Sequence, residues 1–196
     1  MTTSPVSRSA TLPRPVLVVV SGPVAAGKTT LAHRLARSLG CPAICRDEIK
    51  EGMVHSSSGF VASEGDELTK RTLPVFFGVL GLLVRSGVTT VAEAAFQDHV
   101  WRAGLDPLLE VADLRIVQCI APAEVAFRRA RERAVREPVR RAHADPGPDS
   151  DPADFARRYA AFARLHADAP AIDVDTTDGY RPSVAAITEF VRSALR

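Results

Sequence analysis

Gly22-Pro23-Val24-Ala25-Ala26-Gly27-Lys28-Thr29 stands between an apolar run over residues 16–20 and a helical pattern over residues 29–39. Its spacing of Gly, four residues, Gly-Lys and then Ser or Thr is typical of a loop between a buried strand and a helix. In such a loop, backbone N–H groups point at phosphate oxygens, and the helix N-terminus adds a partial positive charge. The stretch therefore predicts a strand, a phosphate-binding turn and a helix, and it favours nucleotide binding over a turn that binds nothing.

Individual residues of this turn have expected roles. We expect Lys28 to reach the β- and γ-phosphates of ATP and to act in catalysis, and we expect the Thr29 hydroxyl to hold Mg²⁺. ATP and Mg²⁺ are therefore the implied cofactors. The nucleotide-binding set that the turn predicts is Gly22, Ala25, Ala26, Gly27, Lys28, Thr29 and Thr30.

Length and composition limit the classes of protein. The chain has 196 residues, a length that fits one α/β domain. Its formal net charge of +2 is too small to indicate a nucleic-acid-binding protein by itself. The three cysteines, Cys41, Cys45 and Cys119, have no His or Cys partners at metal-ligand spacing, so we expect reduced thiols in a cytoplasmic protein. No segment predicts a signal peptide or a membrane span.

Strand and helix patterns alternate along the chain. The expected strands are residues 15–21, 42–45, 88–92, 114–120 and 171–174. The expected helices are residues 29–39, 67–85, 101–111, 122–141, 154–166 and 182–195, and a polar helical stretch begins with residues 46–51. This alternation predicts an α/β fold with a doubly wound, five-stranded parallel sheet. We expect a disordered tail over residues 1–14 and one domain over residues 15–196, with a helical lid over about residues 128–152 and a hinge at residues 145–152.

Acidic residues follow two of the expected strands. Asp47 comes after the second strand, at the sheet edge where catalytic groups of open parallel sheets lie, and it is a candidate base for a hydroxyl acceptor. The alternative is that Asp47 is the N-cap of the next helix. Glu93 ends the third strand, where it could hold Mg²⁺ through water, orient a substrate hydroxyl or cap a turn. Gln97 is a candidate substrate contact on the following loop.

Arg129, Arg133, Arg136 and Arg140 have the spacing of one helical stripe. Guanidinium groups on a closing helix could stabilise charge on a phosphoryl group during its transfer, so Arg129 and Arg133 are candidate catalytic residues. The alternative is a solvated helix face. Thr177 and Tyr180 follow the last strand and could meet the adenine ring, although a plain turn fits the same residues.

Several of these segments together resemble small P-loop kinases, a group of AAA-family ATPases that includes polynucleotide 5′-hydroxyl kinase, chloramphenicol 3-O-phosphotransferase and the zeta toxins. The segments are residues 22–30, 45–48, 91–93, 128–133 and 175–178. The resemblance implies a P-loop NTPase three-layer sandwich, Asp47 as the base, Arg46 and Glu93 at the acceptor, and lid arginines at 129 and 133. The chain departs from the family pattern at the end of the third strand, where it has Ala-Glu-Ala in place of an Asp-containing motif. The resemblance therefore does not by itself assign the Mg²⁺ ligands.

Three functions are compatible with these observations. The first is a kinase for a hydroxyl of a small molecule such as an antibiotic, a nucleoside or a sugar. The second is a kinase for the 5′-hydroxyl of a nucleic acid, which is disfavoured because residues 54–67 contain acids and neither Lys nor Arg. The third is a nucleotide-switched regulatory ATPase. We expect no membrane partner, and the sequence leaves the acceptor and the oligomeric state open.

Overall fold

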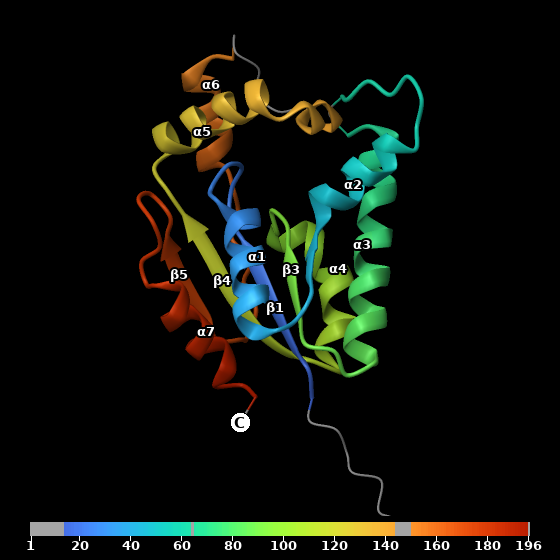
Figure 1. The fold of residues 1–196 in the computed structure, drawn as a ribbon, viewed down its shortest axis with the longest axis vertical. Coiled ribbons are helices and arrows are strands. Elements are labelled where there is room, and N and C mark those ends of the chain that lie inside the picture. The colour runs from blue at the N-terminus through green and yellow to red at the C-terminus, as the bar shows by residue number, and fades with distance from the viewer. Residues whose placement is uncertain (1–13, 64, 144–149, 196) are drawn as a thin grey trace, which may run out of the picture.

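The computed structural model describes residues 14–63, 65–143 and 150–195. Its five strands are β1 (Val16–Ser21), β2 (Ala43–Cys45), β3 (Thr90–Glu93), β4 (Asp113–Ile120) and β5 (Ala171–Asp175) (Figure 1). They form one sheet in the order β2-β3-β1-β4-β5, and every neighbouring pair is parallel. The predicted five-stranded parallel sheet is confirmed.

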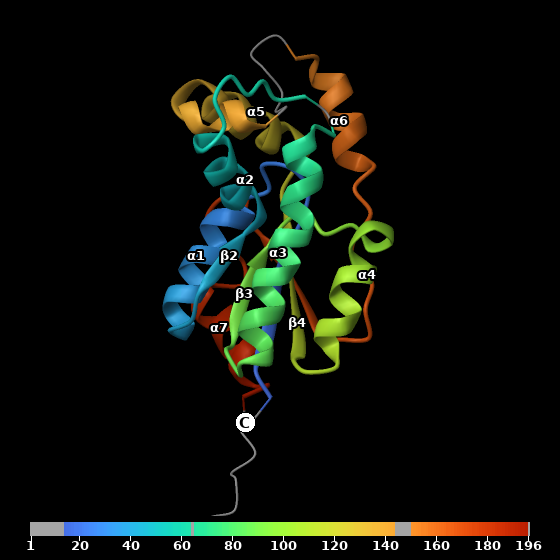
Figure 2. The same ribbon diagram turned by 90° about the vertical axis from the view of Figure 1, so that its right-hand side faces the viewer.

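The central strand β1 explains why the sheet has a helical layer on each face. Residues 16–20 are fully buried, and their side chains alternate between two cores. One core lies under α1 (Lys28–Leu39) and α7 (Val184–Arg192), and the other lies under α3 (Glu67–Arg85) and α4 (Asp98–Leu109) (Figure 2). A strand buried on both faces is near-continuously apolar, as this one is. The three-layer α/β sandwich is therefore confirmed.

The register of the sheet brings three strand ends together. Val20 of β1 and Cys45 of β2 both pair with Glu93 of β3. The phosphate loop, the start of α2 (Arg46–His55) and Glu93 therefore meet at the carboxyl edge of the sheet. In Figure 1, α5 (Ala123–Arg136), the 3₁₀ helix η1 (Pro138–Ala142) and α6 (Pro152–Ala160) lie across this edge.

Two of the predicted helices end five or six residues earlier than expected. The helix expected over residues 122–141 ends at Arg136, and η1 follows it. Pro138 explains the break, because proline disfavours helical backbone at the preceding residue, and Glu137 is extended. The helix expected over residues 154–166 spans Pro152–Ala160, and the chain then runs without regular structure to Pro170.

The ends of the predicted domain and lid are described only in part. Residues 1–13 of the predicted tail and residues 144–149 of the predicted hinge lie outside the described residues. Arg14, the last residue of that tail, donates hydrogen bonds to Asp113 and to the carbonyl oxygens of Leu109 and Glu110. In the described part of the chain, no helix is both long enough and apolar enough to cross a bilayer.

A buried ion pair fixes the position of α2. The Lys50 ammonium lies 2.7 Å from the Asp66 carboxylate, and these side chains are only 3% and 6% exposed. The same carboxylate caps α3 by accepting a hydrogen bond from the Thr69 N–H at 2.7 Å. One carboxylate therefore ties α2 to the first turn of α3, and these two helices border the cavity described next.

Candidate functional site

The turn after β1 has the backbone geometry that its glycines predict. Gly22 has a φ of +147°, and a Cβ there would lie 2.6 Å from the Cys119 carbonyl oxygen. Gly27, with a φ of +80°, and Ala25, with a φ of +57°, are left-handed. Left-handed residues within such a turn create the concave row of N–H groups that binds anions. The turn therefore has the local form of a phosphate-binding loop.

The side chains at the end of this loop converge on Glu93. The Lys28 ammonium donates to the Pro23 carbonyl at 2.9 Å and lies 4.0 Å from the Glu93 carboxylate. The Thr29 hydroxyl donates to the other Glu93 oxygen at 3.1 Å. Because hydroxyl and carboxylate oxygens are ligands that Mg²⁺ accepts, this donor set fits that ion. Three roles were considered for Glu93, and its contact with Thr29 favours the one in which it helps to hold Mg²⁺.

Burial determines the protonation of Glu93. This side chain is 3% exposed. Its burial raises the pKa of the carboxyl group, Lys28 opposes that shift, and the nearby negative charge of Asp47 adds to it, so that the pKa of Glu93 is raised. Glu93 therefore takes up a proton more readily than an exposed glutamate.

A cavity of about 490 Å³ joins the phosphate loop to α2, α3 and α4. Lys28, Thr29 and Glu93 line one end of it. Its other walls combine polar and apolar side chains, namely Arg46, Asp47, Thr69, Lys70, Leu73, Gln97, Val100, Trp101 and Arg140. The predicted substrate contacts Arg46, Glu93 and Gln97 therefore all lie on one cavity with the phosphate loop.

Asp47 is the acidic group on the α2 wall of this cavity. Its carboxylate lies 3.1 Å from Arg46 and 3.5 Å from Arg140, and the side chain is 40% exposed. Burial raises the pKa of Asp47, but the positive fields of His143, Arg140 and Arg46 outweigh it and leave that pKa lowered. The Asp47 carboxylate is therefore ionised at neutral pH.

The alternative role of Asp47 as an N-cap is wrong. The N-cap position of α2 belongs to Cys45, which makes no side-chain cap hydrogen bond, and the helix begins at Arg46. Asp47 lies one residue inside the first turn, where its carboxylate turns toward the two arginines instead of the helix N–H groups.

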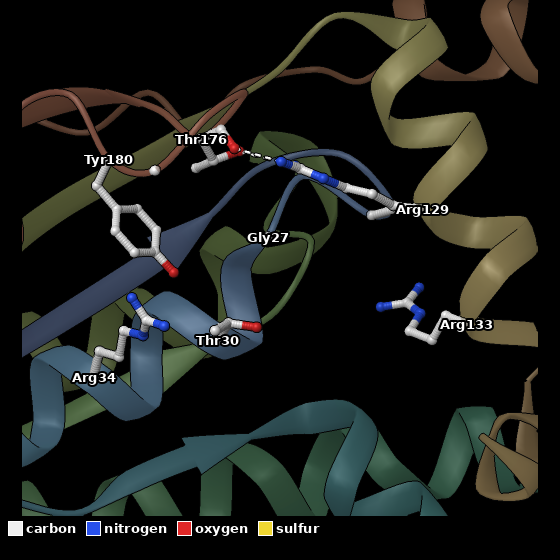
Figure 3. Close-up of a pocket in the computed structure, with 9 residues that line it drawn as sticks. Gly27, Thr30, Arg34, Arg129, Arg133, Thr176 and Tyr180 are labelled. Carbon is white, nitrogen blue, oxygen red and sulfur yellow. Dashed lines mark hydrogen bonds between the residues drawn. The ribbon is translucent and has the colours of Figure 1, made fainter. Parts of the chain in front are cut away.

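A second cavity, of about 360 Å³, also borders the phosphate loop (Figure 3). Arg129 and Arg133 enter it from α5, and Arg34 and Tyr180 lie across from them. The Arg34 guanidinium is 5.4 Å from the centre of the Tyr180 ring. A cavity beside a phosphate loop, bordered by a ring and by guanidinium planes, can hold the nucleobase end of a nucleotide.

The two candidate catalytic arginines have different positions. Arg129 donates to the carbonyl oxygens of Thr176 at 2.5 Å and of Thr177 at 3.1 Å, and it lines the second cavity. Arg133 lines both cavities and thus lies at their junction. Arg136 lines neither cavity.

The remaining predicted nucleotide contacts divide into lining and supporting residues. Ala25, Gly27 and Thr30 line both cavities. Gly22 and Ala26 line neither cavity, and the Ala26 carbonyl accepts a hydrogen bond from the Thr176 hydroxyl at 2.9 Å. Thr177 lines neither cavity, whereas its neighbour Thr176 lines the second cavity.

Sequence reasoning did not select several residues that line these cavities. Arg34 and Thr176 lie on the second cavity, and Lys70, Leu73 and Val100 lie on the larger one. Lys70 is one of three lysines in an arginine-rich chain, which is a usable sequence signal. The others have no local motif, so only the fold identifies them.

Comparisons with known proteins agree with this geometry. A family model described as an AAA domain matches residues 17–146. No curated protein matches the chain. Among solved structures, a candidate kinase from Chloroflexus aurantiacus is 25% identical, with 93% of this chain and 100% of that chain covered and a TM-score of 0.79.

Two further structures share the fold at lower identity. A sugar kinase from a Janibacter species is 22% identical, with 93% of this chain and 95% of that chain covered and a TM-score of 0.55. Kti12 from Chaetomium thermophilum, solved with ADP-AlF3, is 18% identical, with 93% of this chain and 100% of that chain covered and a TM-score of 0.64. At these identities the similarity shows the fold alone.

Proposed function

We propose that this chain, which belongs to the family of P-loop AAA domains whose model it matches, is an ATP-dependent kinase that phosphorylates a hydroxyl group of a small molecule. The acceptors that fit best are alcohols of the size of a sugar, a nucleoside or an antibiotic. The sugar kinase among the structural neighbours supports this class of acceptor. We propose the cytoplasm as the compartment, because it contains ATP and because cysteines such as the three in this chain stay reduced there.

The observation that carries the proposal is the shared cavity. Lys28 and Thr29 of the phosphate loop and the Asp47 carboxylate line the same space of about 490 Å³. That volume is within the usual range for small-molecule sites. Leu73, Val100 and Trp101 supply apolar lining, against which the carbon skeleton of an acceptor can pack.

The nucleotide would occupy both cavities. Its base would lie between Arg129 and the Arg34–Tyr180 pair, and its phosphates would lie on the loop N–H groups beside Lys28. The Thr29 hydroxyl and the Glu93 carboxylate would hold Mg²⁺. When bound, that ion supplies charge neutralisation for the phosphate oxygens.

The chemistry then follows from the positions of three side chains. Asp47 accepts the proton of the acceptor hydroxyl while the hydroxyl oxygen forms a bond to the γ-phosphorus of ATP. The bond between that phosphorus and the β,γ-bridging oxygen breaks, and ADP leaves. Lys28 and Arg133 neutralise the negative charge that develops on the phosphoryl oxygens, because Lys28 follows the loop and Arg133 borders both cavities. Arg46 and Arg140 hold the Asp47 carboxylate in place.

We also propose that residues 128–152 act as a lid. The described part carries Arg133 and Arg140, and it is joined to α2 through Arg140 and His143, which lie 3.4 Å and 3.0 Å from Glu51. Amide hydrogen exchange over residues 128–143 is expected to slow when an ATP analogue and Mg²⁺ are added. Unchanged exchange at saturating nucleotide would leave this segment as a fixed wall of the site.

The decisive experiment is a phosphotransfer screen. Purified protein with ATP and Mg²⁺ is incubated with sugars, nucleosides, aminoglycoside and other hydroxylated antibiotics, and 5′-hydroxyl oligonucleotides, and the phosphorylated products are identified by mass. A small-molecule product that disappears in Asp47→Asn and Lys28→Ala supports the proposal. Transfer to oligonucleotides alone would establish the polynucleotide kinase alternative, and acceptor-independent hydrolysis alone would establish the regulatory ATPase.

A further inference from the structure

Three side chains with metal-ligating atoms meet outside both cavities. They are His33 on α1, Cys45 at the end of β2 and Glu48 in the first turn of α2. One ligand atom of each lies within 4.8 Å of the other two. The His33 Nε2 atom is 2.6 Å from a Glu48 carboxylate oxygen and 3.6 Å from the Cys45 sulfur. None of the three has a role in the proposed phosphotransfer.

We propose that His33, Cys45 and Glu48 form a binding site for one divalent transition-metal ion of the zinc type. The site is distinct from the Mg²⁺ site at Thr29, and it does not depend on the proposed kinase activity. Neither the family match nor the structural neighbours assign a function to these residues.

The distances among the ligand atoms support this assignment. Zinc binds sulfur at about 2.3 Å and imidazole nitrogen at about 2.05 Å, and a tetrahedral angle then places the two atoms about 3.6 Å apart. The sulfur-to-nitrogen distance of 3.6 Å between Cys45 and His33 has this value before any metal is bound. The nitrogen-to-oxygen distance must open from 2.6 Å to about 3.3 Å, a small rotation of the Glu48 side chain.

Burial and exposure suit a three-ligand site with one open position. Cys45 is 2% exposed, and it is fixed at the junction of β2 and α2. His33 and Glu48 are both 46% exposed, so their heads reach solvent and their rotamers can adjust. The protein would supply three ligands, and a water molecule would complete the tetrahedron.

The donor set also selects the metal. One sulfur, one imidazole nitrogen and one carboxylate oxygen suit zinc, cobalt or copper, whereas Mg²⁺ prefers an octahedron of oxygen atoms. The millimolar Mg²⁺ that a kinase assay contains should therefore leave this site free for zinc. The Thr29 and Glu93 oxygens have the opposite preference, so the two sites would separate their ions by chemistry.

A bound ion would join three elements of the active site. Thr29 lies on the same helix as His33, and Arg46 and Asp47 lie between Cys45 and Glu48 in sequence. The ion would hold the first turn of α2 against α1. It would therefore fix the backbone that carries Asp47 and stabilise the folded protein by mass action.

The test uses cobalt as a spectroscopic substitute for zinc. Metal-free protein, prepared by chelation and dialysis, is titrated with Co²⁺ in the presence of excess Mg²⁺. We expect one equivalent to produce a thiolate-to-cobalt absorption band in the near ultraviolet and a tetrahedral d–d band in the visible, and Zn²⁺ to abolish both. The melting temperature of the metal-free protein should rise when Zn²⁺ is added.

Variants separate this site from adventitious binding. His33→Gln and Glu48→Gln, at exposed positions, should each weaken Co²⁺ affinity at least about tenfold while the metal-free melting temperature is retained. Cys45→Ser should lose the thiolate band. Cys41→Ser is the matched control, because Cys41 lies four residues away and outside the cluster, and it should bind Co²⁺ as the parent protein does.

Three results would overturn the proposal. They are the absence of a thiolate band in the parent protein, an unchanged Co²⁺ affinity in both His33→Gln and Glu48→Gln, and loss of the band in Cys41→Ser. Since the two glutamine variants change exposed side chains, they keep the test decisive even where Cys45→Ser fails to fold.

Discussion

The substitution Asp47→Asn separates the chemical role of this residue from its structural one. Asparagine has nearly the same shape, and its amide oxygen can still accept the hydrogen bond that Arg46 now donates at 3.1 Å. It cannot take the proton of an acceptor hydroxyl. Loss of a general base costs about 10²- to 10⁴-fold in rate, which corresponds to about 2.7–5.4 kcal/mol of transition-state stabilisation.

The stability of the protein should change much less than its rate. Asp47 is 40% exposed, and ion pairs at such positions contribute about 0–1 kcal/mol. Arg140 loses its contact with the carboxylate at 3.5 Å but keeps Glu51 at 3.4 Å. For a chain of this length, a loss of 1 kcal/mol lowers the melting temperature by about 2–4 °C. We therefore expect a large fall in kcat with a small change in melting temperature.

The assay compares three quantities on one preparation, namely the rate of transfer to the acceptor found in the screen, the affinity for an ATP analogue and the melting temperature. Asp113→Asn is the matched control, because Asp113 pairs with Arg14 at the same distance of 3.1 Å but at the start of β4, away from the cavity. A near-normal transfer rate in Asp47→Asn would refute the role of Asp47 as the base. Equal losses in the two variants would attribute the effect to stability instead.

Three further predictions concern nucleotide binding, pH and stability. Lys28→Ala and Thr29→Ala should each weaken Mg·ATP binding in a titration with a fluorescent analogue, with a melting temperature close to that of the parent; unchanged affinity in both would contradict the phosphate-loop interpretation. Because the pKa of Glu93 is raised, Mg·ATP affinity should fall as the pH drops through that pKa. Glu93→Gln should bind Mg·ATP more weakly, with an affinity that does not change over the same pH range. An identical pH dependence in both proteins would exclude Glu93 as its source. Asp66→Ala should lower the free energy of unfolding by about 3–5 kcal/mol, because it leaves the Lys50 charge buried and α3 without its cap. Although burial opposes the shift, hydrogen bonds from Lys50 and Thr69 lower the pKa of Asp66 to about 2. The contribution of Asp66 to the free energy of unfolding is therefore present above the ordinary pKa of an aspartate and is lost as the pH falls through about 2. Denaturant titrations at several pH values would measure this loss.

The resemblance to small P-loop kinases is confirmed by the family match and by the shared fold with the Chloroflexus protein. The phosphate loop was predictable because its function is local: eight consecutive residues set the backbone and supply the cation and the hydroxyl. Asp47 and Glu93 were predictable as cavity residues for a related reason, since the carboxyl ends of parallel strands share one edge.

Local sequence patterns were less informative where a turn or a contact between distant residues decides the position of a side chain. The arginine stripe has helical spacing through Arg140, but Pro138 ends the helix before that residue. Arg140 nevertheless reaches Asp47, because η1 lies against α2. Thr177 was selected where Thr176 lines the cavity, since the direction of a side chain in a loop has no period that a sequence reveals.

The sequence by itself determined the order of strands and helices, the buried central strand and the phosphate loop, because each depends on the periodicity or spacing of neighbouring residues. Only the tertiary structure decided which side chains from separate elements meet. It joined Thr29 to Glu93, Lys50 to Asp66 and His33 to Cys45, over separations of 64, 16 and 12 residues. Such contacts depend on how the strands are ordered and how the helices cross them, and no local pattern in the chain records that arrangement.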